Sequence, residues 1–186
     1  MEDSGLVSGE NIDPDRLNVL VGSGIGGIMT LEGEVRKATE KGTVSRVSPF
    51  LVTSVIINIL AGNIAIAYKT TGSCIGMVTA CATGTHAIGE AYRAIKHGYT
   101  DAVIAGASEA PFAPVCFSGF ANMTALSTRE DPDRCSTPFD KERDGFVMGE
   151  GSGIVILEDY ERAAARGAKI YAEVVGYGTT CVDFRS

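Results

Sequence analysis

A short apolar run that leads through small residues into a helix constrains this chain more than any other stretch. Residues 75–80 predict a buried strand, and from residue 82 to 97 apolar residues recur at helical spacing. Cys81 therefore lies on a strand-to-helix turn, where the helix dipole and the unpaired N–H groups of the first turn favour a thiolate. Its small neighbours leave room for a substrate. Cys81 is thus a candidate nucleophile, with a buried structural cysteine as the alternative.

Strands and helices alternate along the rest of the chain. Strands are expected at 17–21, 101–107, 154–157 and 170–177, and helices at 27–40, 54–68, 82–97 and 159–166. This alternation indicates an α/β fold with a mainly parallel sheet. The helix at 54–68 is apolar nearly all round, so we expect it to be buried in a larger core or an interface.

The glycine run at Gly22, Gly24 and Gly27 satisfies G-x-G-x-x-G between a strand and a helix, so dinucleotide binding has to be considered. That reading requires a second strand that ends in an acidic residue about 20 residues further on, and none follows. We therefore expect these glycines to form a tight turn where backbone passes close to other backbone.

Three motifs, which occur along the chain in the order expected for the family, resemble those of the β-ketoacyl-[acyl-carrier-protein] synthases. The first is the stretch around Cys81, which reads ACATG; the second is the stretch PFDKERDGFVMGEG at 138–151; the third is the glycine run. The resemblance runs from about Asp3 to Cys181 and is strongest to the type II, chain-elongating bacterial enzymes. It implies a thiolase-like α/β fold with a mixed, mainly parallel sheet between helix layers, of which residues 1–186 form part of the N-terminal half.

The resemblance also implies an activity and a set of site residues. Members of the family condense an acyl thioester with malonyl-[acyl-carrier-protein] through a cysteine acyl-enzyme, here Cys81, and the implied partner is acyl carrier protein with its phosphopantetheine. Ile25 and Phe120 would line the acyl-chain pocket, no cofactor or metal is expected, and a homodimer or higher oligomer is implied with the 75–80 strand near its two-fold interface. The loop at 140–151 is expected to pair with its own backbone and to support the active site.

The histidines in this chain do not match the catalytic histidines of the family, which belong to its second half. His97 is expected at a helix C-terminus, and His86 lies about 140° around the helix from Cys81, so neither is expected to act as a base. We therefore expect the chain alone not to complete the condensation. A thiolase-like acyl-CoA enzyme and a non-catalytic module that folds or oligomerises remain the alternatives; the motif at 138–151 speaks against the first.

Composition excludes several other functions. A net charge of −7 without a basic stripe makes nucleic acid an unsuitable partner. Five cysteines without a C-x-x-C pair, and only two histidines, argue against a zinc site and suit a reducing cytoplasm. The most apolar run, residues 55–67, is too short to span a bilayer, so we expect a cytoplasmic protein. Residues 182–186 match nothing in the family.

Overall fold

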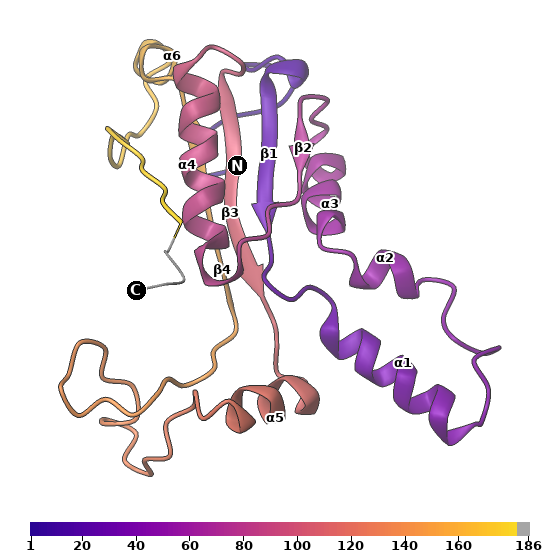
Figure 1. The fold of residues 1–186 in the computed structure, drawn as a ribbon. Helices are drawn as coiled ribbons and strands as arrows, with labels where there is room; N and C mark the ends of the chain where they lie inside the picture. The colour runs from indigo at the N-terminus through magenta and orange to yellow at the C-terminus, as the bar shows by residue number, and fades with distance from the viewer. Residues whose placement is uncertain (182–186) are drawn as a thin grey trace. The chain divides into compact units, whose positions relative to one another are not determined.

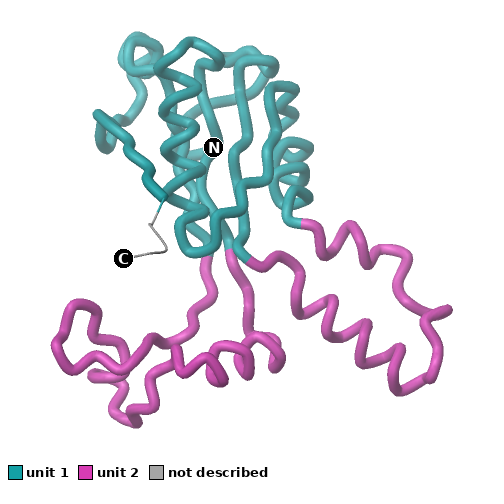
Figure 2. Tube along the Cα trace, in the orientation of Figure 1, with its two compact units in different colours: residues 1–24, 57–108, 152–186 teal, residues 25–56, 109–151 magenta. Residues whose placement is uncertain are grey.

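The structure is a computed structural model that describes residues 1–181. The elements in chain order are η1 (Pro14–Arg16), β1 (Leu17–Gly22), α1 (Ile28–Glu40), α2 (Leu51–Val55), α3 (Asn58–Tyr68), β2 (Cys74–Ile75), η2 (Ala80–Ala82), α4 (Thr83–Lys96), β3 (Ala102–Glu109), α5 (Pro114–Asn122), β4 (Gly151–Glu158) and α6 (Tyr160–Ala165), as Figure 1 shows. The chain divides into two compact units (Figure 2). The prediction about residues 182–186 lies outside the described residues.

Unit 1 comprises Met1–Gly24, Ile57–Ser108 and the residues from Ser152 onward, and it contains the sheet. The strand order is β2-β1-β3-β4. Strand β1 is parallel to β2 and to β3, and Leu17 of β1 pairs with Ala102 of β3. The Asp159 N–H, just after β4, donates to the Asp101 carbonyl, just before β3, so β4 runs antiparallel to β3. The sheet is therefore mixed and mainly parallel, as predicted.

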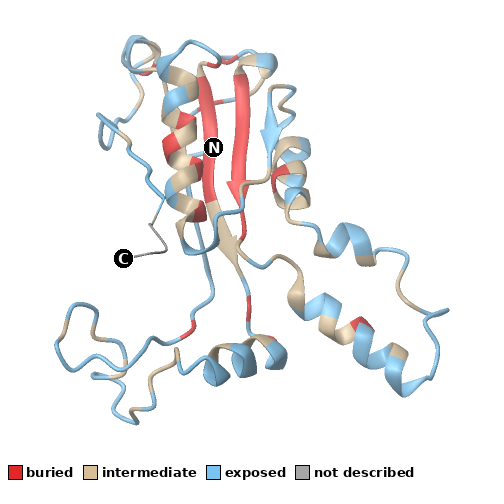
Figure 3. Cartoon of the chain, viewed as in Figure 1, coloured by how far each residue is buried: buried red, intermediate tan, exposed pale blue. Residues whose placement is uncertain are grey.

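Helices cover both faces of this sheet because successive side chains of a strand point to opposite sides. On one face Leu17, Val19 and Val21 of β1 pack with α3, chiefly through Ala61. On the other face Leu20 of β1 and Val103 of β3 pack with Ala91 of α4. Strands β1 and β3 are the most deeply buried part of the sheet (Figure 3). The predicted sheet between helix layers is therefore confirmed.

Three sequence predictions are wrong in detail. The strand expected at 75–80 is only Cys74–Ile75, and it is exposed, because it is an edge strand that pairs with β1 alone. The helix expected at 54–68 is two helices, α2 and α3, because Ile56 adopts an extended conformation between them. Of α3 only Ala61 is buried in this chain. The last predicted strand, 170–177, is not a strand.

Unit 2 comprises Ile25–Ile56 and Glu109–Gly151, and polar contacts account for much of its organisation. In the first segment the Glu34 carboxylate accepts from the Ser48 N–H at 2.9 Å and pairs with Lys37 at 2.7 Å. In the second segment, loop 127–146 binds its own backbone and side chains, as in the contact of the Arg129 guanidinium with the Glu142 carbonyl. Within the loop predicted at 140–151, the Arg143 guanidinium donates to the Asp140 carbonyl at 3.0 Å, but Asp144 and Phe146 bond to residues between 125 and 128, outside that range. The predicted self-pairing is therefore found only in part, and the support of the active site stays a prediction.

Candidate active site

Cys81 lies in a single 3₁₀ turn, Ala80–Ala82, directly before α4. The sequence prediction of a cysteine at the start of a helix is therefore confirmed. The side chain of Cys81 is exposed, as an attacking thiol requires. The first turn of α4 contains no acidic residue, and its last turn contains Arg93 and Lys96. The positive end of the helix dipole therefore faces the turn without an opposing carboxylate.

The other cysteine close to this turn in sequence has a different environment. Partial desolvation raises the pKa of the Cys74 thiol above its ordinary value, so at neutral pH less of it is thiolate. All five cysteines are free thiols. Cys81 is thus distinguished from Cys74 by its position at the start of α4.

Residue Gly22 at the end of β1 lets the chain approach this turn closely. A Cβ at Gly22 would lie 2.0 Å from the Met77 carbonyl oxygen and 2.5 Å from Cγ2 of Thr83. Within unit 2, a Cβ at Gly27 would lie 2.1 Å from the Ser54 carbonyl oxygen. Both contacts are between backbone segments, which supports the prediction that these glycines serve close approach rather than dinucleotide binding.

His86 lies on α4 one turn beyond the cysteine and is bonded to other groups. Its Nδ1 is 2.7 Å from Oγ1 of Thr79 and its Nε2 is 3.1 Å from Oγ1 of Thr179. Both ring nitrogens therefore have hydroxyl partners, and one of these partners, Thr79, lies two residues before Cys81. The other histidine, His97, caps the C-terminal end of α4 as predicted, followed by Gly98 with φ of 74°.

Ile25 and Phe120, the predicted acyl-chain contacts, both belong to unit 2, whereas Cys81 belongs to unit 1. The ring of Phe120 lies edge-on to that of Phe146, with 5.5 Å between centroids. Ile25 is exposed within the glycine run. The predicted role of these two residues stays a prediction.

Sequence reasoning missed the threonines that shape the turn. Thr83 accepts from the Thr79 N–H at 2.9 Å and donates to the Ala80 carbonyl at 2.7 Å. Ala80 has φ of 51°, in the left-handed region that is unfavourable for alanine. Alanine at this position gives no sequence signal for such a conformation. The threonines themselves, at positions 79 and 83, were the available clue, because their hydroxyls readily bond nearby backbone.

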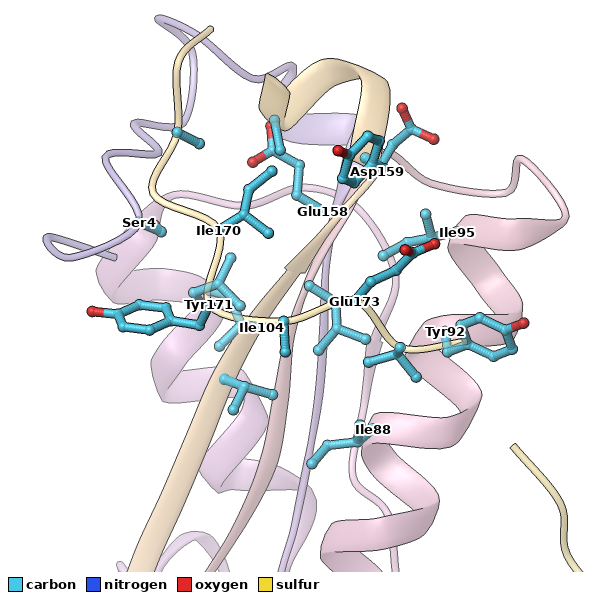
Figure 4. A pocket seen from close by; sticks show the side chains of 18 of the residues that line it. Ser4, Ile88, Tyr92, Ile95, Ile104, Glu158, Asp159, Ile170, Tyr171 and Glu173 are labelled. Carbon is cyan, nitrogen blue, oxygen red and sulfur yellow. The ribbon is translucent and has the colours of Figure 1, made fainter. Parts of the chain in front are cut away.

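A cavity of unit 1 lies apart from this turn. It measures about 870 Å³ and lies beside β4, between α4 and the extended segment after α6. Figure 4 shows Ile88, Tyr92 and Ile95 of α4 on one side of it and Ile170 and Tyr171 on the other. Its lining contains none of the predicted site residues. Among residues 1–181 there is no cluster of metal-ligating side chains and no helix long and apolar enough to cross a membrane.

Comparison with known families places this fold and cysteine turn in a class of enzymes. Residues 1–163 match the family described as beta-ketoacyl synthase, N-terminal domain. The chain therefore belongs to the β-ketoacyl synthase family, and its fold is thiolase-like.

Individual relatives narrow the comparison further. The chain is 50% identical to 3-oxoacyl-[acyl-carrier-protein] synthase 2 of Vibrio cholerae over 96% of its own length and 43% of that protein. It is also 50% identical to the protein of the same name from Synechocystis, over 97% of its length and 43% of the relative. The chain thus spans less than half the length of these curated relatives.

Solved structures agree with this assignment. One is described as a type II PKS acyl-carrier protein in complex with its ketosynthase bound to the hexaketide; it matches with a TM-score of 0.86 and 36% identity, over 91% of this chain and 43% of the other. The ishigamide ketosynthase/chain length factor matches with a TM-score of 0.85 and 30% identity, over 95% and 42% respectively.

Proposed function

We propose that this chain provides the acyl-accepting part of a β-ketoacyl-[acyl-carrier-protein] synthase of fatty-acid elongation, with Cys81 as the nucleophile. The observation that carries the proposal is the exposed thiol in a 3₁₀ turn directly before α4, among small residues. The names of the most similar curated relatives support the reaction class and, with the ketosynthase complex, acyl carrier protein as the partner.

In this reaction the Cys81 thiolate attacks the carbonyl carbon of an acyl thioester carried by pantetheine. A new C–S bond forms to Sγ, the old C–S bond breaks, and the pantetheine thiolate leaves and takes up a proton. The backbone N–H of Cys81 would stabilise the oxyanion of the tetrahedral intermediate. Condensation with the malonyl thioester then transfers the acyl group from Sγ to the carbanion formed by loss of CO2.

The experiment is mass spectrometry after incubation with acyl carrier protein loaded with an octanoyl group. We expect one acyl adduct on Cys81, unchanged in the Cys74→Ala control and absent in Cys81→Ala. Iodoacetamide at neutral pH should label Cys81 before Cys74, whose thiol has the raised pKa. No adduct, or an adduct spread over several cysteines, would overturn the proposal.

We further infer that the protein is a homodimer or higher oligomer that associates through the β2 edge of unit 1. Ile66 of α3 is 78% exposed, and Ile75 of the neighbouring β2 is also exposed. Apolar residues grouped in this way favour association. Light scattering should show a dimer that Ile66→Glu dissociates, whereas Val44→Glu, equally exposed in unit 2, should not. A monomer at micromolar concentration would contradict the inference.

A further inference from the structure

The turn that presents Cys81 is closed by one buried side chain. The hydroxyl of Thr83 links the two residues at the start of the turn: it accepts from the Thr79 N–H at 2.9 Å and donates to the Ala80 carbonyl at 2.7 Å. Thr83 is only 2% exposed. Loss of the hydroxyl would remove this partner from the Thr79 N–H and would leave the Ala80 carbonyl with the Thr83 N–H as its donor on α4.

The conformation held by these bonds is not one that the turn would choose by itself. Ala80 precedes the nucleophile with φ of 51°, where its Cβ approaches the following carbonyl. Such a residue stays left-handed only when its surroundings impose that conformation. The Thr83 hydroxyl bonds the carbonyl of Ala80 itself, so it acts directly on the strained residue.

Two further contacts fix the same turn. The methyl group of Thr83 packs against Gly22, because a Cβ at Gly22 would lie only 2.5 Å from Cγ2 of Thr83. The hydroxyl of Thr79 lies 2.7 Å from Nδ1 of His86, which ties the turn to the second turn of α4. The N–H and the hydroxyl of Thr79 thus both have partners on α4. Cys81 follows in a segment whose start is anchored to the helix it precedes.

We propose that Thr83 is a positioning residue for acyl transfer: its hydroxyl holds Ala80 left-handed and thereby sets the direction of the Cys81 thiol and N–H toward an incoming thioester. This inference rests on the proposed function of Cys81. Thr83 does not touch the acyl group; it acts through the backbone on either side of the cysteine.

Two reagents separate orientation from simple reactivity. Iodoacetamide is small and needs only an accessible thiol. Thioester attack also needs Sγ and the Cys81 N–H to meet one carbonyl group together, and displacement by about 1 Å can cost about 10²-fold in rate. The ratio of the acylation rate to the iodoacetamide rate at Cys81 therefore measures positioning, and a general loss of stability does not move it in the same way.

The experiment compares Thr83→Val and Thr83→Ser with Thr100→Val in the full chain, using octanoyl-loaded acyl carrier protein as the acyl donor. Thr100 is the matched control: it is also 2% exposed in unit 1, and its hydroxyl bonds the Arg16 carbonyl at 2.6 Å. Valine keeps the shape of threonine and removes the hydroxyl, whereas serine keeps the hydroxyl.

We expect Thr83→Val to lower the acylation-to-alkylation ratio about tenfold or more, and Thr83→Ser and Thr100→Val to stay within about twofold of the original chain. If circular dichroism shows that Thr83→Val does not fold, Ala80→Val is used in its place. Ala80 is exposed, and a β-branched residue at this position disfavours the positive φ. We expect Ala80→Val to lower the acylation-to-alkylation ratio by the same amount. An unchanged ratio in Thr83→Val, or in its replacement, overturns the inference alone. Failure of the original chain to be acylated overturns the proposed function and this inference with it.

Discussion

The two units of the chain differ in how they are held together. Unit 1 contains nearly all of the buried apolar side chains, among them Leu17, Val21 and Ile104. Within residues 1–181, the buried apolar residues of unit 2 are only Pro111, Ala113 and Met148. Unit 2 instead relies on carboxylates that bind backbone N–H groups and arginines, such as Glu34 and Asp144.

This difference bears on how rigidly each unit can hold its own predicted functional residues. The candidate nucleophile lies on the unit with its own apolar core, where a side chain and its backbone can be held rigidly. The predicted acyl-chain contacts, Ile25 and Phe120, lie on the unit with little apolar burial. Regions with few buried apolar contacts open at low free energy. We therefore expect the attacking group to be well ordered and the predicted acyl-binding region to be more adaptable.

The largest effect should come from truncating the core of unit 1. Leu17 is fully buried in β1, so Leu17→Ala should lower the free energy of unfolding by about 4 kcal/mol. Leu31→Ala in α1 of unit 2, where the leucine is 37% exposed, should cost about 1 kcal/mol or less. Urea unfolding monitored by circular dichroism gives both values. Equal losses in the two variants would contradict the contrast between the units.

Glycine substitutions should show the same contrast with a somewhat smaller effect. Gly22→Ala drives a Cβ into the Met77 carbonyl and should cost about 3 kcal/mol. Gly33→Ala lies within α1, where a Cβ meets nothing within 4 Å, and should stabilise the chain by up to about 1 kcal/mol. Thermal unfolding of both variants would test this. A neutral Gly22→Ala would show that the turn before Cys81 can move freely.

Acid should loosen unit 2 before unit 1. The hydrogen bond from Ser127, with help from the Thr128 N–H and Arg129, holds the pKa of Asp144 below its ordinary value. Such a carboxylate contributes stability above the ordinary pKa of about 3.9, and this is lost as the pH falls through the lower folded value. Asp140 in the same loop also has a lowered pKa, chiefly through the Glu142 N–H. Hydrogen exchange should therefore lose protection in loop 127–146 below about pH 3.9 while β1 and β3 stay protected.

The smallest expected change isolates one of these carboxylates. Asp144→Asn should make exchange in loop 127–146 faster at neutral pH, because the charge that accepts from Ser127 and Thr128 is removed. Asp133→Asn, in the same loop, is the control and should leave exchange nearly unchanged. Equal acceleration by both variants would show that the loop responds to net charge and not to this particular network.

The sequence predicted most helices and the central strands because their signals are local. Periodicity located α1, α4 and β3. The glycines that follow three of the helices, Gly42, Gly98 and Gly167, have positive φ, as glycines past a helix end commonly do. The break between α2 and α3 was not predicted because residue 56, where the helix is interrupted, is an isoleucine and not a glycine or proline. The prediction of a strand at 170–177 was wrong because an apolar run becomes a strand only where another strand is available to pair with it.

In the candidate site, too, the features with a local sequence signal were predicted and the others were not. Cys81 could be predicted because the change from strand to helix is visible in the sequence. The bonds from Thr83 to the turn and from His86 to Thr179 could not, because they depend on a left-handed alanine and on a partner 93 residues away. Resemblance supplied Ile25 and Phe120, which composition and spacing alone would have assigned to packing.

The pairing of β1 with β3 also bears on how the chain folds as it is synthesised. Leu17 of β1 pairs with Ala102 of β3, so this apolar strand is complete 85 positions before its neighbour. At a translation rate of roughly 5–20 residues per second, β1 waits about 4 to 17 seconds for that partner. Until α3 and β2 have been made, its four buried apolar residues can be protected only by transient contacts or by chaperones, and its edge toward β3 stays unpaired for the whole interval. The deepest part of the folded core is therefore the part most exposed to aggregation while the protein is being made.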